Sequence, residues 1–371
     1  MPSMSTHLYS MERHMDPAAL IPEALPIPVE WGWFYAFLLL TFIIHLLFMN
    51  VMLGSSVIAL VHHLRGKVET EPLTVDISQK LPFIVAFTVN FGVAPLLFLQ
   101  VLYGQFLYTS SVLMAVYWLA VVGLVMLAYV SAYIYDFKYV SLGAMRTVFI
   151  AVTAVCLLAT AFIYTNNMTL MLRPEVWPQY FERPGGTILN LGDPTLIPRY
   201  LHFVVASLAV AGLFLALLWQ RKADRNEAGA RRWVAHGMAW FAYATMAQIA
   251  VGIWFLAALP QPILLLFMGG SGLHTAVLLT GVTLAVLSVI TAMRQKVYLT
   301  TGLLVTTVTV MVFQRDLLRD AYLSPYFDIS DRVVTNEQLP LILFIVTLVL
   351  GVGAIAWMLK QAAMAGKEVR S

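Results

Sequence analysis

The sequence has little cysteine and little charge. Its 371 residues include one cysteine, Cys156, which excludes an intrachain disulfide, an iron–sulfur cluster, a four-thiolate zinc site and covalently attached c-type heme. Charged residues make up 11%, hydrophobic residues make up 60%, and the mean hydropathy is +0.82. This composition predicts a polytopic helical membrane protein. The net charge of +3 comes from dispersed basic residues and gives no indication of nucleic-acid binding.

A recognisable secretion signal is also lacking. Residues 1–30 are polar and proline-rich, without an apolar core followed by a small-residue cleavage site. We therefore expect 1–30 to be a retained extracytoplasmic tail. A transmembrane bundle should follow at 31–360, and a cytoplasmic tail at 361–371.

Nine apolar runs approach the roughly 20 residues that a membrane-spanning helix requires. The sequence thus predicts an all-α transmembrane bundle of about nine spans. The eighth run is short and rich in threonine, and we expect an amphipathic turn after it. The runs are Trp33–Leu64, Leu81–Tyr108, Val112–Tyr135, Thr147–Tyr164, Pro198–Gln220, Trp233–Ala258, Ile263–Met293, Tyr298–Gln314 and Leu339–Leu359.

The connections between these runs differ in basic charge. With nine spans, fifteen Lys and Arg fall on one side and seven on the other. Cytoplasmic loops carry the excess of Lys and Arg, which predicts an N-terminus outside and a C-terminus inside. Long outer loops are expected at 166–198 and 315–338.

Acidic residues are missing from the predicted spans. All 19 Asp and Glu fall in predicted tails, loops or helix ends. Proton-driven transporters normally carry protons on buried carboxylates, so a carboxylate relay is not predicted. A transporter of neutral or apolar solutes remains compatible with the sequence.

The polar groups left inside the spans are mainly histidines and amides. His202 lies about 6 Å inside the outer end of the fifth span, and Met268 about 8 Å inside the seventh. Similar depths predict an axial pair on one heme b. His45 and His274, each about 18 Å deep, could form a second pair. The alternatives are hydrogen-bonded helix histidines and a packing methionine.

Basic and small residues accompany these candidates. Arg199 and Arg315 lie at the predicted outer boundary, where they could bind heme propionates or simply extend to the interface. The small residues 269–272 would leave room for a flat macrocycle.

Four blocks of the sequence resemble subunit I of the cytochrome bd quinol oxidases. The resemblance implies that His202 and Met268 ligate a low-spin heme b and that His45 ligates a high-spin heme. It also implies nine spans, an outer N-terminus and hemes near the outer face. The blocks are His45–Gly54, Asn90–Gly104, Pro198–Leu213 and Phe267–Gly272.

The departures from that family concern oxygen and quinol chemistry. Only Ala257–Pro262 joins the sixth and seventh spans, where the family has a long quinol-oxidising loop. Gln100 stands where the family has a glutamate, and Val312–Asp316 lacks the family's glutamate ligand. The oxygen-reducing site therefore looks dismantled. Asn90 and Gln100 are expected only to set the polarity around a heme.

These observations predict a b-type cytochrome of the bacterial plasma membrane. It would hold one or two hemes and carry electrons between the quinone pool and a periplasmic c-type cytochrome or other redox subunit. Whether it is itself a quinol-linked oxidoreductase or an electron-transfer subunit of one stays open. The alternatives are a reduced terminal oxidase subunit and a cofactor-free scaffold or transporter.

Overall fold

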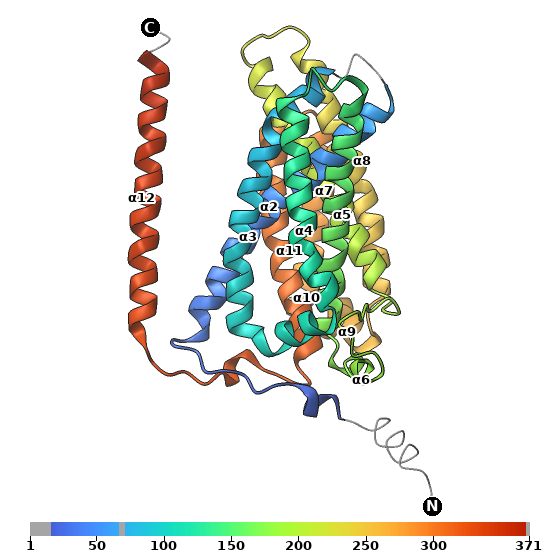
Figure 1. Cartoon of the computed structure of the whole chain (residues 1–371), viewed down its shortest axis with the longest axis vertical. Coiled ribbons are helices and arrows are strands. Elements are labelled where there is room, and N and C mark those ends of the chain that lie inside the picture. The colour runs from blue at the N-terminus through green and yellow to red at the C-terminus, as the bar shows by residue number, and fades with distance from the viewer. Residues whose placement is uncertain (1–15, 67–70, 369–371) are drawn as a thin grey trace, which may run out of the picture.

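The fold consists of long helices running side by side (Figure 1). The computed structural model describes residues 16–66 and 71–368. Within those ranges, nine helices are long and apolar enough to cross a membrane, which confirms the predicted all-α class and number of spans. They are α2 (Trp31–Leu64), α3 (Glu71–Leu113), α4 (Ala115–Phe137), α5 (Arg146–Met171), α7 (Leu196–Ala223), α8 (Ala230–Ala257), α10 (Gly272–Met293), α11 (Val297–Leu323) and α12 (Gln338–Glu368).

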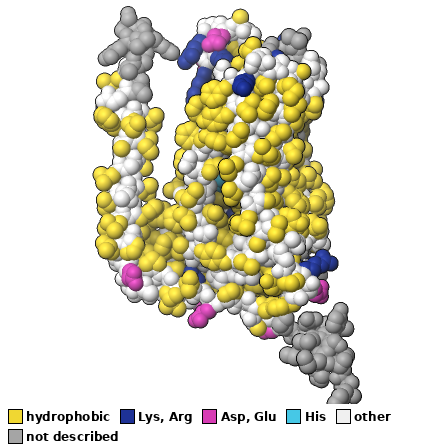
Figure 2. Space-filling view, viewed as in Figure 1, with side chains coloured by type: hydrophobic (Ala, Val, Ile, Leu, Met, Phe, Trp, Pro, Cys, Tyr) yellow, Lys and Arg dark blue, Asp and Glu magenta, His cyan; other side chains and the backbone are white. Residues whose placement is uncertain are grey.

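The two ends of the bundle are named here as they lie in Figure 1. The lower end holds the starts of α2, α4, α7, α10 and α12 and the last turn of α11; the upper end holds the opposite helix ends. Hydrophobic side chains cover most of the face shown in Figure 2, and charged side chains gather towards its two ends. This distribution suits a protein that crosses a membrane.

Five helices pack in a closed circuit. α7 contacts α2 and α8, α10 contacts α8 and α11, and α11 returns to α2 and α7. α3 packs on the other side of α2, and α4 and α5 pack against each other beside it. The circuit therefore brings together the predicted first, fifth, sixth, seventh and eighth spans.

The eighth span is longer than predicted. α11 continues to Leu323, so residues 315–323 are helical instead of forming the start of a loop. Asp316 and Arg319 are buried and form an ion pair within the helix. Because these charges compensate each other inside the protein, they do not end the helix where the apolar run ends.

The seventh span is shorter than predicted. Before α10 the chain forms a short helix, α9 (Gln261–Leu265), and a π-helical turn at Leu266–Gly270. Gly269 has a φ of 109° and Ser271 is extended, so the hydrogen-bond ladder is interrupted before Gly272. A glycine accepts such a φ without the steric penalty of a side chain.

The last span stands apart from the circuit. α12 touches the bundle through Phe344, whose ring centre lies 5.0 Å from that of Phe37 and 6.0 Å from that of Phe98 (Figure 1). The helix continues to Glu368, past the predicted boundary at 360. At the lower end, the Ile27 N–H donates a 2.8 Å hydrogen bond to the Val333 carbonyl and ties residues 16–30 to the segment before α12.

Candidate functional site

His202 lies in the second turn of α7 and faces α8. Its ring centre is 6.3 Å from that of Phe255, and a Cβ on Gly252 would lie 3.3 Å from His202 Cε1. Nδ1 is buried, and no atom of residues 16–66 or 71–368 forms a hydrogen bond with it. Buried polar atoms are nearly always paired. An unpaired imidazole nitrogen in this position therefore points to a ligand.

Two arginines in the same region form no ion pair with an acidic residue of the described ranges. The Arg199 guanidinium lies 4.9 Å from the centre of the Phe255 ring, and its Nε is buried without a hydrogen bond to the described residues. Arg315 lies 4.4 Å from the centre of the Phe42 ring and donates a 2.9 Å hydrogen bond to Met168 Sδ. The two guanidinium groups are close enough to repel each other. Because uncompensated buried charge is costly, this arrangement suits an anionic ligand.

His45 is held between α2 and α3. Its Nδ1 lies 3.1 Å from the Thr88 carbonyl oxygen, so the tautomer protonated at Nδ1 donates this bond. Nε2 then keeps its lone pair, and it forms no hydrogen bond within the described ranges. Metal-ligating histidines usually donate their other ring N–H in this way. The geometry is compatible with the prediction that His45 binds iron.

Gly92 of α3 makes room for the His45 ring. A Cβ on Gly92 would lie 2.8 Å from His45 Cε1. We expect Gly92→Leu to displace the imidazole from Thr88 and to lower the free energy of unfolding by about 1–3 kcal/mol, the usual cost of overpacking. Thermal unfolding in a fixed detergent measures the loss. Gly123→Leu on α4 is the control, because a Cβ there meets nothing within 4 Å; equal stability of the two variants would contradict the prediction.

One aromatic ring links the two candidate regions. The Phe42 ring centre lies 6.5 Å from that of His45, one turn further along α2. The same ring lies under the Arg315 guanidinium. The His45 region and the Arg315 region are therefore neighbours inside the bundle, separated by a single side chain.

Met268 and His274 lie on a segment that is not the unbroken helix assumed by the prediction. Met268 is 62% exposed and belongs to the π-helical turn before α10. His274 lies in the first turn of α10, with Nδ1 2.8 Å from Ser271 Oγ. The predicted depths assumed an unbroken helix from Ile263. Because the helix restarts at Gly272, His274 lies in a first helical turn and not in the middle of a helix, and both residues lie near the lower end.

No hydrogen bond or ring contact within the described residues joins His202 to Met268 or His45 to His274. Both pairs stay predictions. The two imidazoles lie against different helices, His45 against α3 and His202 against α8.

No hydrogen bond joins the two predicted amides of α3 to these histidines in the described structure. Asn90 is exposed and donates a 2.8 Å hydrogen bond to the Ala86 carbonyl of its own helix. Gln100 is half-buried. Their role in setting the polarity around a heme stays a prediction.

A buried acid on α11 escaped the sequence analysis. Asp316 is 2% exposed, accepts a hydrogen bond from the Tyr35 hydroxyl and pairs with Arg319. The Arg319 guanidinium lies 4.2 Å from the centre of the Tyr103 ring, whose hydroxyl donates a 3.2 Å bond to Asp320 Oδ1. The prediction that all acids lie in tails, loops or helix ends is wrong for Asp316. The i,i+3 spacing of Asp and Arg, which places both on one helix face, was the available signal.

A pair of histidines at the upper end also went unrecognised. His62 is 3% exposed, and its Nε2 lies 3.1 Å from Nε2 of His236 on α8. The Trp240 indole N–H donates a 3.2 Å bond to the same His236 nitrogen. In the part of the chain that the structure describes, no group of three or more His, Cys, Asp or Glu is placed to hold a metal ion. We assign this pair to the packing of α2 on α8.

The fold and these interior groups define a polytopic helical membrane protein with a partly polar site among its helices. No protein-family model matches the sequence, and no curated protein matches it significantly. Fold alone does not imply function. The function is therefore argued from the site.

Proposed function

We propose that this chain is a membrane b-type cytochrome. It passes electrons between the quinone pool and a periplasmic redox partner such as a c-type cytochrome. The observation that carries this proposal is the buried imidazole of His202, whose Nδ1 has no hydrogen bond within the described residues, in the same region as two arginines that form no ion pair there. A heme b offers an iron for the imidazole and two propionates for the guanidinium groups.

The residues present fit a non-covalent heme. His202 would bind the iron, with Met268 as a second predicted ligand. Arg199 and Arg315 would bind the propionates, and Gly252 lets the imidazole lie close against α8. A bound heme takes up and releases one electron at a time. The chain would hold it in an apolar interior, and the polarity of that interior and the ligating residues would tune the reduction potential.

His45 is the proposed ligand of a second heme. Its Nδ1–H is fixed by the Thr88 carbonyl, which orients Nε2 and makes it more basic. His274, predicted as the opposite ligand, lies near the lower end, so we propose His45 as the protein ligand on its own. Phe42 lies between this region and the first site.

We infer that the lower end faces the periplasm across a bacterial inner membrane. The predicted connections at the upper end carry most of the Lys and Arg, which the positive-inside rule assigns to the cytoplasm. Arg199 lies in the first turn of α7 and Arg315 in the last third of α11. The proposed heme edge would then lie near the outer surface, within reach of a periplasmic partner.

A visible spectrum of the purified protein tests the proposal. Protein from heme-replete cells should show the reduced α band of a b-type heme. His202→Ala should remove the low-spin signal, because the variant lacks the nitrogen proposed to bind iron. His236→Ala is the matched control, since it removes a helix histidine at the upper end, and its spectrum should match that of the unmodified protein.

Three outcomes would overturn parts of this proposal. An unchanged spectrum in His202→Ala would remove His202 from the heme site. A colourless preparation would favour the scaffold or transporter. Carbon monoxide binding to the reduced protein would indicate an open heme position and favour the terminal oxidase.

A further inference from the structure

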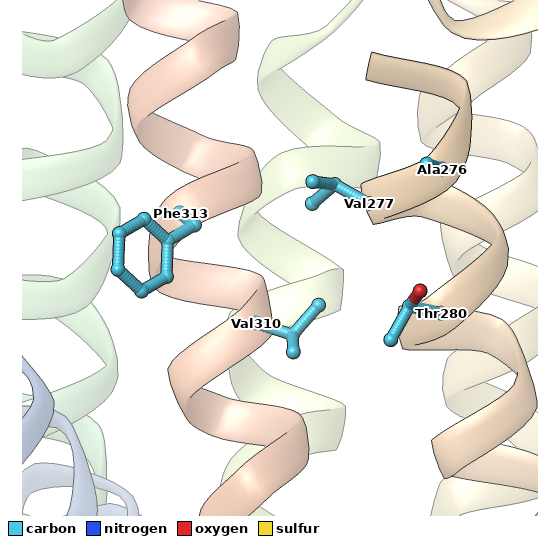
Figure 3. Close-up of a pocket in the computed structure, with 5 residues that line it drawn as sticks. All are labelled: Ala276, Val277, Thr280, Val310 and Phe313. Atoms are coloured by element: carbon cyan, nitrogen blue, oxygen red, sulfur yellow. The ribbon is translucent and has the colours of Figure 1, made fainter. Parts of the chain in front are cut away.

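An apolar groove lies between α10 and α11 (Figure 3). Its volume is about 180 Å³, and it is lined by Ala276, Val277, Thr280, Val310 and Phe313. Both helices are candidate membrane spans. A ligand of this groove would therefore be a lipid-soluble molecule with an apolar chain.

Two proton acceptors lie just beyond the lower end of this groove. α10 and α11 are antiparallel neighbours, and a Cβ on Gly281 would lie 2.7 Å from Met311 Cε, which fixes their register. His274 lies seven residues before Gly281 on α10, which is about two helical turns towards the lower end. Two turns beyond Met311 on α11, in the same direction, the chain comes close to Asp320. His274 and Asp320 are near enough for electrostatic attraction.

Each of these groups has an acceptor atom available. Asp320 is exposed, and its Oδ1 accepts the Tyr103 hydroxyl, whereas Oδ2 forms no hydrogen bond with the described residues. The His274 tautomer that donates from Nδ1 to Ser271 Oγ leaves the Nε2 lone pair free. A carboxylate and an imidazole at the same level of two neighbouring helices suit a ligand that carries two hydroxyl protons.

The face of α11 that lines the groove continues to the acceptor. Val310, Phe313 and Asp320 are spaced by three and seven residues, so they share one helix face. The ten residues from Val310 to Asp320 span about 15 Å. The ligand would thus have a polar head near Asp320 and an apolar chain that follows α11 towards the membrane interior.

We propose that this is the binding site of a prenylated quinol, with its head between Asp320 and His274 and its chain in the groove. The proposal rests on the function proposed above. Oxidation breaks the two O–H bonds of the quinol, giving one proton to Asp320 and one to His274. The two electrons leave singly to a one-electron acceptor, the b-type heme, and the product is the quinone. Because Asp320 is exposed at the lower end, its proton can be released on that side.

Quinone binding to the purified chain in lipid nanodiscs tests this site without electron transfer. Decylubiquinone and a short-chain menaquinone are titrated separately, which distinguishes a benzoquinone head from a naphthoquinone head. Val277→Trp fills the groove and should raise the Kd about tenfold or more. Val286→Trp is the matched control, because Val286 is an exposed residue of α10 outside the groove, and its Kd should not change. Val277→Phe replaces the tryptophan variant if the latter does not fold.

Variants that remove an acceptor group test the part of the site that would bind the quinol head. Asp320→Asn and His274→Ala should each raise the Kd about tenfold. Glu175→Gln is the control at the same end: Glu175 pairs with Arg173 at the surface and is not among the charges that act on Asp320. Its Kd should match that of the unmodified chain.

The outcomes separate this site from the proposed function. An unchanged Kd in both Val277→Trp and Asp320→Asn would overturn the site, and a normal heme spectrum in the same samples would leave the cytochrome proposal standing. Quinone binding that these variants weaken, in protein that never contains heme, would support the site and overturn the cytochrome proposal.

Discussion

Replacing Gly54 with leucine is expected to prevent the bundle from assembling. A Cβ on Gly54 would lie 1.9 Å from the Ser207 carbonyl oxygen and 2.6 Å from Ala211 Cβ, atoms that cannot rotate away. α2 and α7 would have to separate along a contact on which the five-helix circuit depends. We expect a loss of more than about 4 kcal/mol in the free energy of unfolding. Little monodisperse protein should be recovered by size-exclusion chromatography after extraction in mild detergent.

The control for this variant lies on the same helix. A Cβ on Gly32 meets nothing within 4 Å, so Gly32→Leu adds the same side chain without a steric conflict. Its recovery and thermal midpoint should stay close to those of the unmodified protein. Similar midpoints for Gly32→Leu and Gly54→Leu would contradict the close approach of α2 and α7.

The same close packing continues on the other side of α7. A Cβ on Gly237 would lie 2.6 Å from the Gly212 carbonyl oxygen, so α8 also approaches α7 backbone to backbone. Small residues allow such approaches between membrane helices. α7 carries His202 and α8 carries Gly252, so these glycine contacts set the spacing of the candidate heme site.

Local composition was sufficient to predict the spans. The first predicted span and α2 both end at Leu64, and the seventh predicted span and α10 both end at Met293. A helix in lipid satisfies its own backbone hydrogen bonds, so its existence depends on a run of apolar residues that the sequence displays directly. The break before Gly272 was not predicted, because glycine is tolerated within membrane helices as well as between them.

Groups that depend on distant partners could not be predicted in the same way. The Tyr35 hydroxyl and Asp316 lie 281 residues apart, and His62 and His236 lie 174 residues apart. A hydropathy scale scores a charged side chain without regard to its partners, so the sequence placed Asp316 outside the membrane span. Tertiary pairing reverses that result, because Arg319 and Tyr35 compensate the carboxylate inside the protein.

The candidate site was predictable in part. His202 and Arg199 are three residues apart on one helix, so the sequence alone placed them together. That Phe255 lies beside both, and that Arg315 approaches Arg199, depends on how α7, α8 and α11 pack. The unpartnered Nδ1 of His202 also becomes visible only when the surrounding side chains are in place.

Removing one member of the buried ion pair on α11 is expected to destabilise the protein more than removing both. The Asp316 and Arg319 side chains are 3% and 5% exposed. Asp316→Leu leaves the guanidinium buried without its counter-charge, which should lower the free energy of unfolding by about 3–5 kcal/mol. The double variant Asp316→Leu/Arg319→Leu removes both charges and should recover most of that loss, because apolar pairs of similar volume often replace buried ion pairs at little cost.

Reversible unfolding in denaturant, measured on the two single variants and the double variant, gives the coupling free energy between the two positions. The control is an ion pair at the surface of the lower end, Arg173 with Glu175, whose side chains are 27% and 42% exposed. Glu175→Gln should cost less than about 1 kcal/mol, because solvent screens exposed pairs. Strict additivity of Asp316→Leu and Arg319→Leu would mean that the two charges do not compensate each other, and α11 would then need another explanation for staying helical through residues 315–323.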